Sequence, residues 1–190
     1  MDLIFATHNL HKLQEVQQLV GNKFNLKSLS DIGCTVDIPE TGHTFRDNAS
    51  QKSSYIFGHY GLNCFADDSG LEVTALNNEP GVYSAHYSGT RDSAQNLQLV
   101  LDKLGNQTNR EARFVAVISL MLNGKEYFFE GAVQGHISTQ MAGQQGFGYD
   151  PIFIPEGYNC TFADLPAAEK NRISHRGKAM TKLIDFLLKQ

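Results

Sequence analysis

The spacing of apolar residues along the chain predicts four helices. In residues 10–20 and 92–104 the apolar positions recur every three or four residues, and a glycine follows each stretch. Residues 44–60 have a helical but rather polar pattern. The last stretch, from about Gly177, carries one continuous apolar stripe, which indicates a helix that packs against a core.

Short apolar runs predict the strands, at residues 3–6, 24–29, 64–66, 71–74, 114–122 and 127–137. The last two runs are joined around Asn123 and Gly124, a pair that is typical of a tight hairpin turn. Strands and helices alternate, without a repeat or a linker. The pattern therefore predicts one α/β domain with a mixed sheet.

The composition of the chain limits the kinds of partner that the protein could bind and the compartment where it could work. The chain of 190 residues has a net charge of -4, which argues against binding a nucleic-acid polymer. No apolar run approaches the roughly 18 residues of a membrane span, and the first residues do not resemble a secretory leader. Three cysteines without C-x-x-C spacing indicate neither a disulfide framework nor a zinc site. We therefore expect a cytoplasmic protein without a membrane partner.

Two adjacent acids, Asp67 and Asp68, follow the apolar run at residues 64–66, and Ser69 and Gly70 come directly after them. Two acids at the end of a strand favour a hard cation, with one carboxylate free to act as a base. The alternative is an ordinary Asp-Ser-Gly turn between two strands, because these residues are common in turns. A further carboxylate, Glu40, could add a ligand, although a lone loop Glu is weak support.

The segment Thr7–Lys12 lies where the first strand is expected to end and the first helix to begin. Its residues are Thr7, His8, Asn9, Leu10, His11 and Lys12. A helix N-terminus presents free backbone N–H groups and the positive end of the helix dipole, which suits a phosphate. The alternative is that Asn9 merely caps the helix and Lys12 is solvated.

Two later segments could bind the rest of a nucleotide. Glycines flank Phe147 in Gln145–Pro151, so its ring could stack on a planar base. Residues 169–178 gather four cations and a histidine in an otherwise acidic chain, which favours an anionic or carbonyl-rich ligand. The alternative for the first segment is that its aromatic side chains simply pack into the core. The alternative for the second is a basic segment that is simply solvated. The Tyr-rich loop at residues 79–89 could line a site or face a partner.

These segments, in this order, resemble the Ham1/inosine triphosphatase family over essentially the whole chain. The most specific runs are Ala66–Leu71, Gly146–Pro151 and Ser174–Gly177. The resemblance implies two α/β lobes around a long mixed β-sheet with flanking helices, with the substrate in the cleft between the lobes. It also implies a homodimer that uses Mg²⁺ to hydrolyse ITP, dITP and XTP to the monophosphate and pyrophosphate, cleansing the nucleotide pool.

The resemblance also assigns roles to residues on the phosphate side. The segment Thr7–Lys12 corresponds to the family's triphosphate cradle. Asp68 takes the place of the catalytic base and of a metal-associated acid, and Glu40 that of the other metal carboxylate. Ser69 matches a substrate contact, and Asp67 is expected to support Asp68.

On the base side, the resemblance implies that Phe147 stacks on the purine. The residues that complete this wall are Gly148, Tyr149 and Asp150. The residues that read the carbonyl at the six-position of the base are Lys170, His175 and Arg176. Donors aimed at a keto oxygen would be left unpaired by the amino group of adenine, so we expect selectivity against ATP.

One departure from the family stands at His86, where the family usually has arginine. Histidine lacks the permanent charge and the fork of donors that arginine offers.

Two other functions stay open. One is a related pyrophosphatase for modified pyrimidine nucleotides, as in Maf-like proteins of similar architecture. The other is a nucleotide-binding regulatory module without catalysis, which would have no need of a water-activating acid.

Overall fold

The computed structural model describes residues 2–190. Its strands are β1 (Asp2–Phe5), β2 (Asn25–Lys27), β3 (Cys64–Val73), β4 (Glu79–Pro80), β5 (Glu111–Leu122), β6 (Lys125–Ile137) and β7 (Phe153–Pro155). Its α-helices are α1 (Leu10–Val20), α2 (Phe45–Tyr60), α3 (Ser93–Leu104), α4 (Ala167–Ile173) and α5 (His175–Leu187). Short 3-10 turns are η1 (Ser30–Ile32), η2 (Thr74–Leu76), η3 (Gly81–His86), η4 (Asp150–Ile152) and η5 (Phe162–Asp164).

The strands form one mixed sheet in the order β2-β1-β3-β5-β6-β7, with β4 paired to β3. Strand β1 runs parallel to β2 and β3, whereas β4 is antiparallel to β3 and β7 is antiparallel to β6. The predicted α/β fold with a mixed sheet and flanking helices is therefore confirmed. None of the helices in residues 2–190 is long and apolar enough to span a membrane.

The chain folds into two compact units. Unit 1 comprises Met1–Asp68, Ala116–Gly131 and Arg176–Gln190, and unit 2 comprises Ser69–Val115 and Ala132–His175. Strands β3, β5 and β6 each contribute residues to both units.

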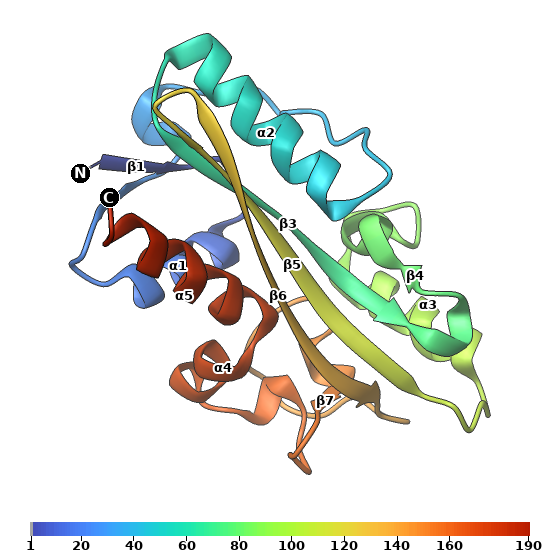
Figure 1. Cartoon of the computed structure of the whole chain (residues 1–190). Helices are drawn as coiled ribbons and strands as arrows, with labels where there is room; N and C mark the ends of the chain where they lie inside the picture. Colours follow the sequence, from blue (N-terminus) through green and yellow to red (C-terminus); the bar gives the residue numbers. More distant parts are fainter. Residues whose placement is uncertain (1) are drawn as a thin grey trace. The chain divides into compact units, whose positions relative to one another are not determined.

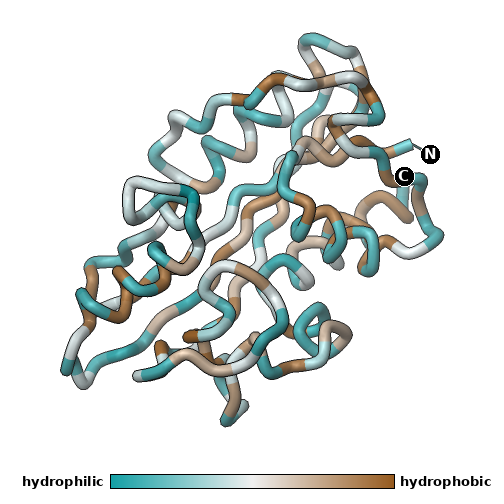
Figure 2. Tube along the Cα trace, turned by 180° about the vertical axis from the view of Figure 1, so that it is seen from behind, coloured by the Kyte–Doolittle hydropathy of each residue, from teal (hydrophilic) through white to brown (hydrophobic). Residues whose placement is uncertain are grey.

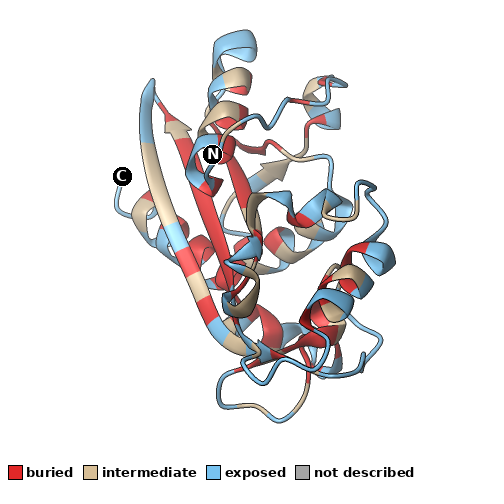
Figure 3. Ribbon diagram, turned by 90° about the vertical axis from the view of Figure 1, so that its right-hand side faces the viewer, coloured by how far each residue is buried: buried red, intermediate tan, exposed pale blue. Residues whose placement is uncertain are grey.

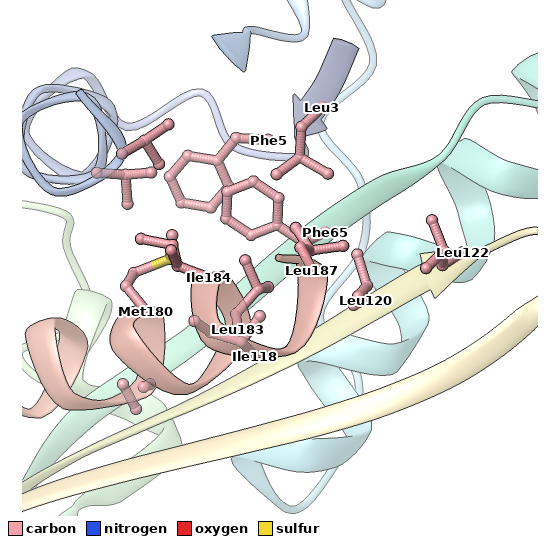
Figure 4. Close-up of a cluster of buried hydrophobic side chains, with 14 residues drawn as sticks. Leu3, Phe5, Phe65, Ile118, Leu120, Leu122, Met180, Leu183, Ile184 and Leu187 are labelled. Carbon is pink, nitrogen blue, oxygen red and sulfur yellow. The ribbon is translucent and has the colours of Figure 1, made fainter. Parts of the chain in front are cut away.

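Unit 1 has helices on both faces of its part of the sheet (Figure 1). Because strand side chains alternate, Leu3 and Phe5 of β1 pack against α1 and α5, whereas Ile4 packs on the side of α2. Phe5 stacks on Phe65 of β3 with ring centroids 4.5 Å apart. Figure 4 shows the apolar stripe of α5, including Met180, Leu183, Ile184 and Leu187, beside these rings.

Unit 2 has its own core, in which α3 packs its apolar face against β3, β5 and β6. Phe114 of β5 lies at its centre, with Phe153 and Phe162 at ring-centroid distances of 4.7 and 6.0 Å. In Figure 2 brown apolar residues recur between teal polar residues along the helices. In Figure 3 the strands β3 and β5 are mostly buried, whereas the helices expose their outer faces.

Most predicted elements are confirmed. Thr44, Asn9 and Asp92 cap the three predicted helices that begin near them. Asn123 and Gly124 have positive φ angles of 51° and 78°, as a tight hairpin turn requires. The strand expected at residues 24–29 is shorter, because only Asn25–Lys27 pairs with β1. The last helix begins at His175, two residues before the expected start.

The strand does not end at the acid pair as expected, and the alternative of a turn there is also wrong. Residues 64–66 and 71–74 are not two strands, because β3 continues without interruption from Cys64 to Val73. Asp67 and Asp68 therefore lie inside a strand and are both buried. Buried carboxylates require charged or hydrogen-bonding partners, and the partners come from other parts of unit 1.

Candidate active site

Asp67 lies in β3 between two cations. Its Oδ1 accepts a hydrogen bond from Lys12 Nζ at 3.0 Å, and its Oδ2 accepts one from Arg176 Nε at 3.1 Å. Arg176 also donates from Nη1 to Glu15 Oε2 at 2.5 Å. Burial alone would raise the pKa of Asp67, but Lys12, Arg176 and Lys52 together hold this pKa well below its usual range. Asp67 is therefore an ionised structural acid that orders the cations around it.

Asp68 has the opposite electrostatic character. Burial raises the pKa of its carboxyl group, and the nearby Glu40 raises it further, whereas Lys52, Lys12 and a hydrogen bond from Asn48 lower it. The net effect is a raised pKa, which makes Asp68 a stronger base than an exposed aspartate. Asn48 donates from Nδ2 to Asp68 Oδ2 at 2.9 Å.

Lys52 of α2 links the acids of unit 1. Its Nζ donates to the backbone oxygen of Asp67 at 2.6 Å and forms an ion pair with Glu40. Burial lowers the pKa of Lys52, but the negative charges of Glu40, Asp67 and Asp68 outweigh this effect and raise it overall. Lys52 therefore stays protonated between the three acids.

Glu40 and Asp68 fit a divalent cation by the chemistry of their donor atoms. Among residues 2–190, no group of three or more His, Cys, Asp and Glu side chains could hold a metal ion by itself. Mg²⁺ in nucleotide sites typically uses one or two carboxylates together with phosphate oxygens and water. The charge of Glu40 acts on Asp68, so the two carboxylates lie near enough to repel each other. A cation there would relieve this repulsion.

The segment expected to hold phosphates contains a turn and the start of α1. Asn9 accepts hydrogen bonds from the backbone N–H groups of His11 and Lys12, at 3.0 and 3.1 Å, and Thr7 accepts one from Asn9 N. Asn9 thus caps α1, and binding of phosphate by this segment stays a prediction. His8 Nε2 lies 2.9 Å from the carbonyl oxygen of Val36. Leu10 is largely exposed, and Lys12 is not simply solvated because it contacts Asp67.

Unit 2 holds the aromatic segment. Phe147 is half-buried between Gly146 and Gly148, whose positive φ angles of 76° and 62° favour glycine. Asp150 is buried and accepts hydrogen bonds from Phe147 N at 2.8 Å and from Lys170 Nζ at 2.7 Å. Lys170 Nζ also lies 5.0 Å from the centre of the Phe147 ring. The segment is thus a fixed loop around a buried ion pair.

The basic segment is a helix followed by the start of α5, not a solvated stretch. Lys170, His175 and Arg176 are buried, whereas Arg172 is exposed. His175 stacks on Phe114, with ring centroids 4.7 Å apart and planes 9° from parallel. Lys170 and His175 belong to unit 2, whereas Arg176 joins the acids of unit 1. Contacts of these side chains with a base stay predictions.

The loop at residues 79–89 is tied to the aromatic segment. Tyr149 donates its hydroxyl hydrogen to the backbone oxygen of Ser84 at 2.8 Å, and Ser84 Oγ accepts a hydrogen bond from Leu71 N at 2.9 Å. Burial raises the pKa of Tyr149, so its hydroxyl stays protonated as a donor. His86, at the end of η3, is exposed and meets the ring of Tyr83 edge-on at 5.9 Å.

The pattern of apolar residues alone missed Asn48, Lys52 and Glu15. Asn48 and Lys52 are buried on the face of α2 that also buries Ala49 and Ile56. Their spacing of four residues places both on one side of the helix. A polar pair at this spacing on an otherwise apolar face is the sequence feature that could have pointed to them. Ser69, predicted as a substrate contact, is half-buried in β3.

Comparison with known proteins agrees with this fold. The model of the Ham1 family matches residues 3–186. A dITP/XTP pyrophosphatase of Flavobacterium psychrophilum is 50% identical over 187 residues, which are 98% of each chain. Solved Ham1 proteins of Staphylococcus aureus and Coxiella burnetii are 38% and 37% identical, with TM-scores of 0.90 and 0.92. Each match covers 100% of this chain. It covers 99% of the Staphylococcus aureus chain and 100% of the Coxiella burnetii chain.

The fold defines an α/β protein with a mixed sheet, in which a buried acid pair lies among cations. With the family model matched over nearly its full length, the chain belongs to the Ham1 family.

Proposed function

We propose that this protein is a nucleoside triphosphate pyrophosphatase that hydrolyses ITP, dITP and XTP to the monophosphate and pyrophosphate. It would thereby remove deaminated purines from the nucleotide pool. Support comes from the relatives, several of which carry the name dITP/XTP pyrophosphatase at 41–50% identity. The observation that carries the proposal is Asp68, a buried carboxylate of raised pKa set among cations and a second acid.

In the proposed reaction, Asp68 orients a water molecule and accepts its proton while the water oxygen attacks the α-phosphorus. The bond between the α-phosphorus and the bridging oxygen breaks, and pyrophosphate leaves with that oxygen. Because the pKa of Asp68 is raised, the carboxylate is better matched to this task than an ordinary aspartate. Lys12 and the start of α1 would bind the negative charge of the phosphates.

We propose Mg²⁺ as the cofactor, held by Glu40 and Asp68 together with substrate phosphates. When bound, it would neutralise charge on the phosphates and on the leaving pyrophosphate. Asp67, Lys12, Arg176 and Lys52 would keep the surrounding charges fixed, because their contacts with one another are already formed. Such preorganisation avoids the cost of rearranging dipoles during the reaction.

For the base, we propose that Phe147 stacks on the purine and that Lys170 and His175 read its keto oxygen. The resemblance to the Ham1 family implies that the substrate lies in a cleft between two lobes. Arg176 is the third predicted reader, and its contacts with Asp67 and Glu15 also give it a role in ordering the acids. The homodimer and the cytoplasmic location stay predictions.

The test of the proposal is pyrophosphate release from a panel of nucleotides, with and without Mg²⁺. ITP, dITP and XTP should react at least about tenfold faster than ATP, because the amino group of adenine leaves buried donors unpaired. Equal rates on ITP, ATP and GTP would refute the proposed selectivity. A modified pyrimidine triphosphate in the panel tests the related class of pyrophosphatase, and binding without turnover would indicate a regulatory module.

The variant Asp68→Asn tests the proposed base. It should fold and lose about 100-fold or more of turnover, which is the usual contribution of a general base. Glu72→Gln is the matched control, because Glu72 is another carboxylate of β3 that pairs with Arg113 at 2.6 Å, outside the acid cluster. Near-normal turnover in Asp68→Asn would rule out its role as the base.

A further inference from the structure

The side chain of Asn48 connects two parts of the acid cluster. It is buried on α2, one turn after the capping residue Thr44. Its Nδ2 donates to Asp68 Oδ2 at 2.9 Å, and its Oδ1 accepts a hydrogen bond from Gly42 N at 2.8 Å. Gly42 lies two residues after Glu40. One amide thus joins the strand that carries Asp68 to the loop that carries Glu40.

The orientation of this amide is fixed by its partners. The backbone N–H of Gly42 can only donate, so the oxygen of the Asn48 amide must face it. The NH₂ group then faces Asp68, whose ionised carboxylate can only accept. Rotation of the amide by half a turn would lose both hydrogen bonds at once.

The loop approaches α2 so closely that position 42 has no room for a side chain. A Cβ atom on Gly42 would lie 2.5 Å from Cβ of Asp47 and 2.9 Å from Oδ1 of Asn48. These distances are far below ordinary contact, so the glycine is what allows the amide to reach the loop backbone. Sequence and structure therefore agree that Gly42 and Asn48 act as a pair.

Glu40 gains its position from this attachment. Its side chain is 40% exposed, and a carboxylate on a loop has many accessible rotamers unless the backbone beneath it is held. Asn48 holds that backbone two residues away, and Lys52, one turn further along the same face of α2, pairs with Glu40 itself. The face of α2 thus sets where Glu40 lies relative to Asp68.

We propose that Asn48 is a positioning residue for hydrolysis, whose amide fixes the Asp68 carboxylate relative to the loop of Glu40. The inference rests on the proposed function, because Asn48 acts through Asp68. In metal sites, residues that hydrogen-bond a ligating carboxylate and fix its orientation contribute about 10- to 100-fold to activity. The loss should appear in kcat, because the phosphates and the base are bound by other residues.

The experiment compares Asn48→Leu and Asn48→Ala with the wild-type protein, using ITP and Mg²⁺. Asn48→Leu has a similar shape and adds no charge, but it removes the donor to Asp68. Both variants should lose about 10- to 100-fold in kcat, with KM changed less than about threefold. The affinity for ITP measured by calorimetry in EDTA should also change less than about threefold. If Asn48→Ala does not fold, Asn48→Leu, which leaves no cavity, carries the comparison.

Gln51→Ala is the matched control. Gln51 lies on the same helix and ties the same loop, since its Oε1 accepts a hydrogen bond from Thr41 N at 3.0 Å and its Nε2 donates to Thr41 Oγ1 at 3.2 Å. Its amide does not bond to Asp68. Turnover of Gln51→Ala should stay within about twofold of the wild type. If Gln51→Ala costs as much kcat as Asn48→Ala, general anchoring of the loop explains both, and the proposal is overturned.

A double-mutant cycle separates a role through Asp68 from an independent one. In the Asp68→Asn background, Asn48→Ala should cost less than about threefold in kcat, because its target is already gone. A full, additive loss there would overturn the proposal, as would wild-type kcat in both Asn48 variants. Failure of the proposed function is distinguishable, because it would show as a wild-type protein that releases no pyrophosphate or as a fully active Asp68→Asn variant.

Discussion

Two neighbouring aspartates of β3 have opposite electrostatic roles, and this difference predicts opposite effects on stability. Asp67→Asn should destabilise the protein at pH 7 by about 3–5 kcal/mol, because it removes the carboxylate charge that pairs with the buried Lys12 and Arg176. The folded-state pKa of Asp67 is lowered, so its contribution is present above the unfolded value of about 4 and is lost as the pH falls further. Urea unfolding of both proteins from pH 7 to pH 3 should show the difference shrinking below about pH 4.

Asp68→Asn should instead stabilise the metal-free protein at pH 7. The folded-state pKa of Asp68 is raised, so ionisation of this carboxyl opposes folding at neutral pH, and asparagine removes that cost. Below about pH 4 the carboxyl is protonated in both the folded and the unfolded state, and the two proteins should be equally stable. Urea unfolding in EDTA over the same pH range measures this. A variant that is less stable than the wild type at pH 7 would contradict the assigned electrostatics of Asp68.

At the scale of single residues, the sequence predicted which types of residue lie in the candidate site but not which of them form ion pairs with one another. Asp67 was expected to support Asp68, yet its partners Lys12 and Arg176 lie 55 and 109 residues away along the chain. No local pattern contains such pairs. This is also why the acids were expected at the end of a strand, with an Asp-Ser-Gly turn as the alternative, although β3 continues through them.

At the scale of elements, the loop around Phe147 depends on a close approach of its backbone to Asp150. A Cβ atom on Gly146 would lie 2.1 Å from Asp150 Oδ2, whereas nothing lies within 4 Å of one on Gly148. Both glycines have positive φ, so Gly146→Ala and Gly148→Ala share a backbone cost of about 1–2 kcal/mol. Gly146→Ala should lower the free energy of unfolding further, because it also disturbs the buried pair of Asp150 with Lys170. Thermal unfolding of both variants measures the difference, and equal losses would contradict it.

Elements with strong local features were predictable from the sequence. The hairpin at Asn123 and Gly124 and the apolar stripe of α5 each follow from residues close together in the chain. Strand β2 was expected to be longer, because its apolar residues extend beyond the three that pair with β1. Helix α4 was not expected, because its cations favoured a ligand-binding segment, and only the fold shows Lys170 buried against Asp150.

At the scale of the whole molecule, the two units hold different parts of the proposed chemistry. Unit 1 contains the acids and Lys12, whereas unit 2 contains Phe147, Lys170 and His175. Substitutions in unit 1 should therefore act on all nucleoside triphosphates alike, because every one of them carries the same phosphates. Substitutions in unit 2 should alter the choice between bases.

This division is tested by Lys12→Met and His175→Phe, with kcat/KM measured for ITP and ATP. Lys12→Met should lower both values by a similar factor, since a phosphate contact carries no information about the base. Phenylalanine at position 175 can keep the stacking on Phe114 but removes the ring N–H donors, so the ITP to ATP ratio should fall about tenfold. The proposed division would be contradicted if the ITP to ATP ratio stayed unchanged in His175→Phe or changed in Lys12→Met. Recognition of the base would then not belong to unit 2 alone.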